Sequence, residues 1–227
     1  MIRFDSDYTE GCIPEILTAL TNTNDEQTIG YGKDSHCQNA ANLIKQIIKR
    51  EDADIHFMVG GTQTNIAVIT AILKHHQGAI CADSGHINAH ETGALESVGH
   101  KCLTLPTSNG KITAKQVDTL IINHYNDASA EHTVQPGIVY ISFPTESGTL
   151  YTKQELKDLY NICQKHNIPL FIDGARLGYG LMAKKNDVTF EDIANLCDVF
   201  YIGGTKVGAL FGECIVILND LYKKDFR

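Results

Sequence analysis

Two side chains with clear chemical potential follow apolar runs in the second half of the chain. Asp173 comes directly after Leu170–Ile172 and is followed by Arg176, and Lys206 stands among glycines after Asp198–Ile202. A carboxylate at the end of a buried strand is costly without a partner, so we expect Asp173 to be paired or functional. Arg176 offers a planar fork for a carboxylate or a phosphate. A lysine amine in such a place can attack a carbonyl carbon, although Lys206 taken alone is equally compatible with a surface position.

A glycine-rich segment, Gly60-Gly61-Thr62, separates another apolar run from a helical pattern. Two glycines allow close approach of an anion, and the free N–H groups of a helix N-terminus can bind it together with the Thr62 hydroxyl. The segment matches neither the Walker loop nor the Rossmann GxGxxG pattern, and a purely structural turn would look the same. His86 follows the next apolar run, where its ring could cover a planar ligand or transfer a proton.

A zinc site is an alternative interpretation of this region, because Cys81, His86 and His90 have a spacing that a metal could use. We disfavour it because the sequence has no second His/Cys pair at the spacing of a structural site. For His90 a satisfied or surface histidine is the simpler interpretation. The sequence therefore predicts no metal.

Together these residues match the needs of pyridoxal phosphate. That cofactor requires a lysine amine, a carboxylate that keeps its ring nitrogen protonated, and a cradle for its phosphate. Lys206, Asp173 and Gly60-Gly61-Thr62 would supply the three.

The rest of the chain must position these residues, and its pattern is that of an α/β fold. From residue 55 onward short apolar runs alternate with amphipathic stretches of helical length, which predicts a mainly parallel sheet of about seven strands with helices on both faces. In such a sheet ligands bind at the carboxyl ends of the strands. The expected strands are Ile55–Val59, Ala79–Ala82, Lys101–Leu105, Gly137–Ser142, Leu170–Asp173, Asp198–Ile202 and Cys214–Leu218, the last pairing directly with its predecessor. The expected helices between them are Thr64–His75, Asn88–Val98, Thr113–Tyr125, Lys153–His166 and Thr189–Leu196.

The first 50 residues form a separate unit in this interpretation. Two helices, Pro14–Leu20 and Ser35–Arg50, are joined by a polar segment and a Gly30-Tyr31-Gly32 turn. We therefore expect an N-terminal helical arm over residues 1–50 and a cofactor-binding domain over residues 51–227.

Composition narrows the function classes. The chain has 227 residues, 43% of them hydrophobic, and a net charge of 19 − 27 = −8. An acidic chain lacks the basic surface that binds nucleic acid or anionic lipid, and no apolar run reaches the roughly 20 residues of a membrane span. We expect a cytoplasmic protein without a nucleic-acid or membrane partner. The seven cysteines are scattered and are expected to be reduced, small core residues.

Several motifs, in order along the chain, resemble those of fold-type-I pyridoxal phosphate enzymes, and among them the threonine aldolase and β-eliminating lyase family. Asp173-Gly174-Ala175-Arg176-Leu177 is the most specific of them. The others are Ser6-Asp7, Gly30-Tyr31-Gly32-Lys33-Asp34, Gly60-Gly61-Thr62-Gln63-Thr64-Asn65, Asp83-Ser84-Gly85-His86 with His90-Glu91-Thr92-Gly93, and Gly204-Thr205-Lys206-Val207-Gly208.

The resemblance implies a role for each matching residue. Lys206 would hold the cofactor covalently, Asp173 would pair with its ring nitrogen, and His86 would stack on the ring and take part in proton transfer. The phosphate would be held by Gly61, Thr62 and Thr205. The substrate carboxylate or the phenolate side of the cofactor would contact Arg176 and Ser6, and Tyr31 would reach toward a neighbouring subunit in a homodimer or homotetramer.

The implied reaction of amino acid metabolism is the cleavage of a β-hydroxy-α-amino acid, such as L-threonine or L-allo-threonine, to glycine and an aldehyde. Two alternatives stay open. The segment Ser142–Thr149 carries no histidine where the aldolases usually have one, which keeps another β-eliminating lyase activity possible. The family continues for roughly a hundred further residues, so we expect the small C-terminal domain to be absent or only begun, and a non-catalytic remnant is the second alternative.

Overall fold

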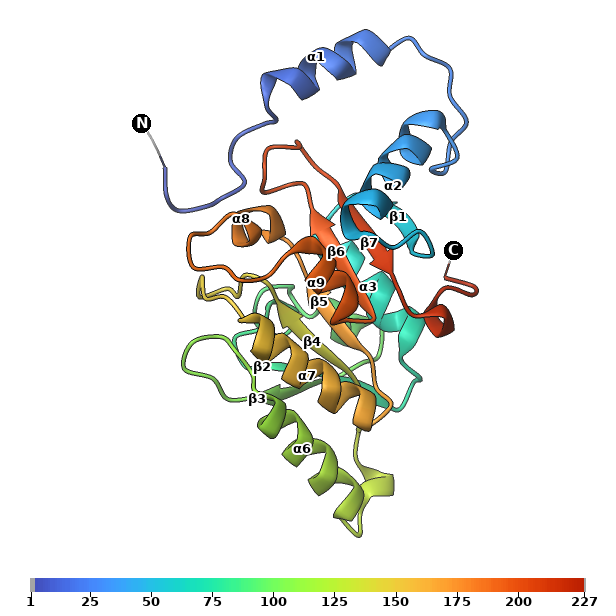
Figure 1. The fold of residues 1–227 in the computed structure, drawn as a ribbon. Helices are drawn as coiled ribbons and strands as arrows, with labels where there is room; N and C mark the ends of the chain where they lie inside the picture. Colours follow the sequence, from blue (N-terminus) through green and yellow to red (C-terminus); the bar gives the residue numbers. More distant parts are fainter. Residues whose placement is uncertain (1–2, 227) are drawn as a thin grey trace.

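The computed structural model describes residues 3–226, and within them the chain forms one seven-stranded sheet (Figure 1). The strand order is β1-β7-β6-β5-β4-β2-β3. Neighbours are parallel from β6 to β3, whereas β7 runs antiparallel to both β6 and β1. This confirms the mainly parallel sheet and the direct pairing of the last strand with its predecessor. The strands are β1 (Asp54–Met58), β2 (Gln77–Ala82), β3 (Cys102–Leu105), β4 (Gln135–Ser142), β5 (Leu170–Asp173), β6 (Val199–Gly203) and β7 (Glu213–Ile217).

Helices cover both faces of the sheet, as the alternation predicted. Successive residues of a strand point to opposite faces, so in β4 Val139 and Ile141 pack into one core while Ile138 and Tyr140 pack into the other. The first core is closed by α2 (Ser35–Ile48), α6 (Ala114–Asn126), α7 (Lys153–Lys165), α8 (Leu177–Leu181) and α9 (Phe190–Asn195). The second is closed by α3 (Gly61–Ile72), α4 (His86–Ala89) and α5 (Ala94–Ser97).

The predicted helix Asn88–Val98 is wrong. The segment forms the two short helices α4 and α5, because Thr92 and Gly93 adopt left-handed backbone conformations with φ of 55° and 73°. Such angles interrupt an α-helix, and glycine adopts them without strain. The break directs the residues between α4 and α5 back toward the sheet, where Glu91 is buried.

The helix predicted at Thr64–His75 begins earlier, at Gly61, and ends at Ile72. Its first turn therefore lies at the carboxyl end of β1. Helix α8 and the two short 3₁₀ helices, η1 (Ala130–His132) and η2 (Asp220–Tyr222), were not predicted.

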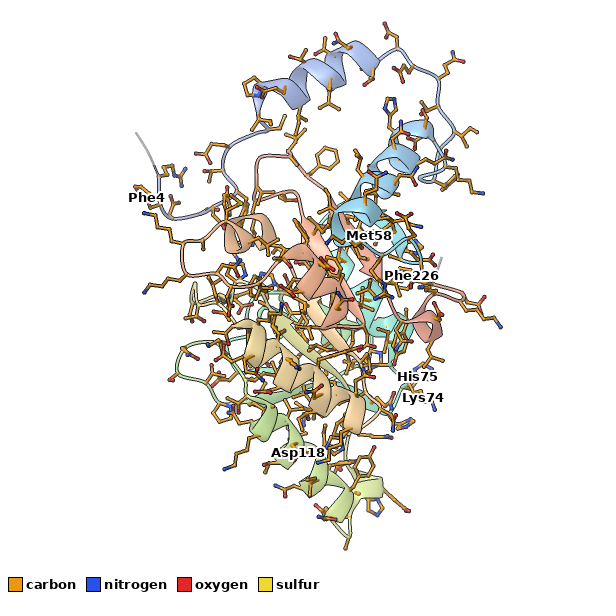
Figure 2. All side chains as sticks on the ribbon, viewed as in Figure 1. Phe4, Met58, Lys74, His75, Asp118 and Phe226 are labelled. Atoms are coloured by element: carbon orange, nitrogen blue, oxygen red, sulfur yellow. The ribbon has the colours of Figure 1, made fainter. Side chains whose placement is uncertain are left out.

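The N-terminal segment has two parts with different degrees of contact. Helix α1 (Pro14–Thr23) has no buried residue and stands away from the main body, where its side chains project freely (Figures 1 and 2). One attachment is the hydrogen bond from Ile13 N to Gly208 O, 3.0 Å long. Helix α2 instead contributes the buried Ile48 to the first core, and Lys49 forms an ion pair with Glu191 of α9. At the other end of the described chain, Phe226 packs with Met58 onto the second core (Figure 2).

Five of the seven cysteines are buried, which confirms the prediction of small core residues for those five, while Cys12 and Cys37 are partly exposed. Across residues 3–226, no helix combines the length and apolarity that crossing a bilayer requires.

A candidate cofactor pocket at the carboxyl edge of the sheet

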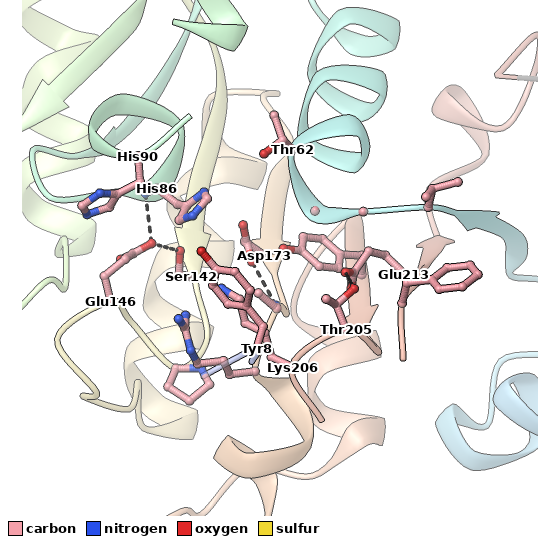
Figure 3. A pocket seen from close by; sticks show the side chains of 18 residues that line it. Tyr8, Thr62, His86, His90, Ser142, Glu146, Asp173, Thr205, Lys206 and Glu213 are labelled. Carbon is pink, nitrogen blue, oxygen red and sulfur yellow. Dashed lines mark hydrogen bonds between the residues drawn. The ribbon is translucent and has the colours of Figure 1, made fainter. Parts of the chain in front are cut away.

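A pocket of about 360 Å³ lies where β5 and β6 end and α3 begins (Figure 3). Its position agrees with the rule that open α/β sheets bind ligands at the carboxyl ends of their strands. Seven of the nine predicted site residues line it: Gly61, Thr62, His86, Asp173, Arg176, Thr205 and Lys206.

The other two predicted residues lie outside this pocket. Ser6 lines a neighbouring hollow with Asp7 and Tyr179, and its hydroxyl oxygen is buried without a hydrogen-bond partner. Tyr31 is 90% exposed and borders a different hollow beside Met58. Within this single chain, therefore, neither side chain reaches the pocket.

The carboxylate of Asp173 is held by four hydrogen-bond donors at the bottom of the pocket. Tyr201 Oη donates to Oδ1 over 2.5 Å, and the Ala175 N–H donates to the same oxygen over 3.0 Å. Tyr140 Oη and Asn65 Nδ2 donate to Oδ2 over 2.5 and 3.1 Å. Each donor replaces a hydrogen bond to water that the carboxylate loses on burial. Asp173 is thus paired, as its position predicted.

The two tyrosines of this cluster were missed by sequence reasoning. Tyr140 and Tyr201 are fully buried, and the negative charge of Asp173 adds to burial in raising their pKa values far above that of free tyrosine. Each phenol therefore stays protonated and acts as a donor. The sequence signal for them was a tyrosine near the end of an apolar strand, because the hydroxyl group of a buried tyrosine usually needs a hydrogen-bond partner.

A second buried cluster adjoins the first. His86 Nδ1 lies 2.8 Å from Glu91 Oε1, and Asn65 Nδ2 donates to the same oxygen over 2.7 Å. The hydrogen bond with Glu91 raises the pKa of His86 above its ordinary value, although burial acts in the opposite direction. Because Asn65 also contacts Asp173, the two carboxylates share one amide.

The start of α3 has the features of an anion cradle. Gly60 precedes the helix in an extended conformation, and no side chain caps the N-terminal N–H groups. A Cβ atom on Gly61 would lie 3.2 Å from Tyr201 Oη, so the glycine keeps this side of the pocket open. Free N–H groups at a helix N-terminus attract a phosphate, and this part of the pocket fits one.

Lys206 lies in the loop between β6 and β7, opposite the start of α3 (Figure 3). Burial lowers its pKa, and the charge of Arg176 lowers it further. A larger share of the amine is therefore neutral and nucleophilic near neutral pH than for a free lysine. The ring of Tyr8 covers the amine, with 5.5 Å from Nζ to the ring centroid.

The N-terminal segment also forms an ion pair with Arg176. The guanidinium donates to both carboxylate oxygens of Asp7, and this contact lowers the pKa of Asp7. Arg176 thus holds an internal carboxylate in the way that the sequence predicted for a ligand carboxylate. The contacts of Tyr8 with Lys206 and of Asp7 with Arg176 were both missed, because nothing local in the sequence shows which strand end the N-terminus will meet.

Thr205 lines the pocket but directs its hydroxyl to a buried carboxylate. Thr205 Oγ1 donates to Glu213 Oε1 over 2.8 Å, and the Gly204 N–H donates to Oε2 over 3.1 Å. Burial raises the pKa of Glu213. Sequence reasoning missed this residue, although a glutamate beginning the apolar run Glu213–Ile217 is an unusual choice that signals a partner.

The remaining wall is formed by residues from the loop after β4. Glu146 Oε1 accepts hydrogen bonds from Ser142 Oγ over 2.6 Å and from the His86 N–H over 2.9 Å (Figure 3). The ring of His90 lies 5.7 Å from that of His86, centroid to centroid. Among the residues that the structure describes, no three His, Cys, Asp or Glu side chains converge as metal ligands.

Fold and pocket together define a class, the pyridoxal phosphate-dependent enzymes with a transferase-like α/β domain. Residues 4–224 match the beta-eliminating lyase family, so the chain belongs to that family. Members of this family are pyridoxal phosphate-dependent.

Several relatives are threonine aldolases. The chain is 29% identical to the low specificity L-threonine aldolase of Pseudomonas sp. strain NCIMB 10558 over 99% of its own length, and 29% identical to that of Pseudomonas aeruginosa over the same share. The solved threonine aldolase of Leishmania major is 47% identical, with a TM-score of 0.94 over 98% of this chain. A solved pyridoxal phosphate-bound putative aminotransferase from Clostridium difficile 630, 16% identical with a TM-score of 0.68 over 95% of this chain and 56% of its own, shares the fold. The chain spans 64% of the length of each of the three aldolases.

Proposed function

We propose that this chain binds pyridoxal 5′-phosphate and belongs to an enzyme that cleaves L-threonine or L-allo-threonine to glycine and acetaldehyde. The observation that carries the proposal is one pocket in which the amine of Lys206, the carboxylate of Asp173 and the uncapped start of α3 face the same space. These are the three groups that the cofactor requires. The similarity to threonine aldolases supports the choice of substrate.

In this proposal each of the pocket residues has a separate role. Lys206 would hold the cofactor covalently, Gly61 and Thr62 would hold its phosphate, and Asp173 would pair with its ring nitrogen. The cofactor supplies an electron sink for the bond that breaks at the α-carbon. His86 would stack on the cofactor ring.

A base must remove the proton of the substrate's β-hydroxyl group before the bond to the α-carbon breaks. Three groups in the pocket wall can accept this proton: His86, His90 and Glu146. The sequence has no histidine in Ser142–Thr149, and Glu146 of that segment reaches the pocket instead. We therefore include Glu146 among the candidate bases.

The test is to add pyridoxal phosphate and then L-threonine to the purified chain. We expect a visible absorbance band on cofactor addition, which borohydride reduction makes permanent, and equal amounts of glycine and acetaldehyde after substrate addition. Pyruvate and ammonia from serine would instead favour a β-eliminating activity. A chain that binds the cofactor and releases neither product pair would favour a remnant that needs further residues, and absence of the band would contradict the proposal.

We also propose that residues 1–50 act as an arm for a second copy of the chain, while residues 51–227 form the cofactor-binding domain. Helix α1 exposes Leu17 and Leu20 by 53% and 49%, and Tyr31 is exposed by 90%. Exposed apolar side chains of this number on one segment are typical of an interaction surface. A partner's arm would bring its Tyr31 toward a pocket that Tyr31 of the same chain does not reach.

Light scattering should therefore give at least twice the chain mass of 25.0 kDa, that is 2 × 25.0 = 50 kDa, or twice that for a tetramer. Replacing Leu17 and Leu20 by glutamate should shift the mass toward the monomer, because charges placed in an apolar interface are costly. Leu221→Glu is the matched control, since Leu221 is 80% exposed on η2 at the other end of the chain. A monomeric unsubstituted chain would contradict the proposal.

A further inference from the structure

Glu91 is a buried carboxylate next to the pocket rather than in its wall. Its side chain is 1% exposed, while that of its partner His86 is 29% exposed. The break between α4 and α5 brings Glu91 back under the histidine five residues earlier. The carboxylate therefore faces the protein interior, and the other edge of the imidazole ring faces the pocket.

The hydrogen bonds of Glu91 are uneven. Oε1 accepts from Asn65 Nδ2 and lies 2.8 Å from His86 Nδ1, whereas Oε2 is buried without a partner. A buried carboxylate with one empty oxygen is stable only if its remaining partners are strong. A protonated Nδ1 on His86 meets that need, because a charged donor forms a stronger hydrogen bond than a neutral one.

Other charges around His86 act on it from farther away. The charge of Asp173 favours the protonated ring and that of Lys206 opposes it. Glu146 accepts from the backbone N–H of His86, and the ring of His90 is tilted 48° to it. Glu91 is the charged group placed within hydrogen-bond distance of the ring itself.

We propose that Glu91 is a positioning residue that keeps a proton of His86 on Nδ1, stabilises the protonated ring, and directs Nε2 to the pocket, so that Nε2 is the nitrogen that takes up or releases a proton there. Asn65 joins this pair to Asp173, so the group above the pocket and the group at its bottom keep a fixed spacing. The meaning of this arrangement for catalysis rests on the proposed function. The protonation of His86 itself does not, because it can be measured without cofactor.

The first experiment is a pH titration of the whole 227-residue chain, without cofactor, by ¹⁵N NMR of its imidazole rings, with His86→Gln to assign the signals. Glu91→Gln keeps the oxygen that accepts from Asn65 and His86 and removes the charge. We expect it to lower the titration midpoint of His86 by about one pH unit or more, a tenfold change in its protonation equilibrium. Glu91→Asp, which restores the charge, should recover at least part of the shift.

The matched control is Glu96→Gln, which removes the same charge from an exposed position five residues away. It should leave the His86 midpoint unchanged. An equal midpoint in Glu91→Gln and in the unsubstituted chain would overturn the proposal, because a merely structural glutamate would not move it.

The second experiment needs no substitution at Glu91 and so does not depend on whether such a variant folds. Above its midpoint, neutral His86 should carry its proton on Nδ1, with Nε2 showing the ¹⁵N shift of a bare nitrogen. A proton on Nε2 would overturn the proposal whatever the variants do. Failure of the proposed function would show separately, as absence of the visible band in a chain whose His86 titrates as expected.

Discussion

Replacing Lys206 by alanine is expected to abolish covalent attachment of pyridoxal phosphate. The amine is partly buried in the pocket, and burial and Arg176 both lower its pKa, which makes it the amine best prepared to attack the cofactor's aldehyde. We expect borohydride reduction to leave no label on the variant, and turnover, where the unsubstituted chain shows it, to fall by roughly a thousandfold or more. Peptide mapping after reduction measures the first effect, and aldehyde release measures the second.

Lys184→Ala is the matched control for Lys206→Ala, because Lys184 is exposed and does not line the pocket. It should retain the absorbance band and the labelled peptide that contains Lys206. If Lys206→Ala kept a labelled lysine in the same pocket, or kept the band at full strength, the assignment of Lys206 would be wrong.

Replacing Gly174 by alanine is expected to destabilise the whole domain. A Cβ atom there would lie 1.9 Å from the backbone oxygen of Tyr201, and Gly174 O accepts a hydrogen bond from the Gly203 N–H over 2.9 Å. Neither backbone can move aside without separating β5 from β6. We expect a loss of about 3 kcal/mol or more in the free energy of unfolding, which for a chain of this size lowers Tm by about 6–12 °C.

Gly60→Ala tests whether this effect comes from the contact and not from the loss of any glycine. No atom lies within 4 Å of a Cβ at Gly60, and its backbone is extended. Thermal unfolding of this variant should differ from that of the unsubstituted chain by less than about 1 kcal/mol. Equal Tm values for Gly174→Ala and the unsubstituted chain would contradict the tight packing of β5 on β6.

Much of the fold could be predicted because its signals are local. Apolar runs of strand length alternate with helical patterns from residue 55 onward, and each of the seven predicted strands is present within one or two residues of its expected ends. The single helix predicted at Asn88–Val98 failed for a physical reason. The apolar pattern continues through Thr92-Gly93, but the backbone there is left-handed. The periodicity of apolar residues carries no information on backbone angles.

The candidate site, like the fold, could be predicted only in part. Asp173 and Lys206 follow strands directly, so the rule on carboxyl ends was enough to bring them together. Tyr201 and Asn65 serve the site through contacts between elements that are distant in sequence, such as the 108 positions between Asn65 and Asp173. The roles of Ser6 and Tyr31 stay predictions, because neither side chain lines the pocket within this single chain.

The position of β7 has a consequence for the order in which the protein can be completed during synthesis. In the described sheet β1 is an edge strand whose neighbour is β7, although more than 150 residues separate them in the chain, as the pairing of Asp54 with Ile217 shows. A nascent chain that has released β1 to β6 holds the start of α3 without the strand that fixes it beside the Lys206 loop. Domains form as units as they leave the ribosome. The pocket is therefore complete only after β7, the last of the seven strands of the described sheet, has left the ribosome.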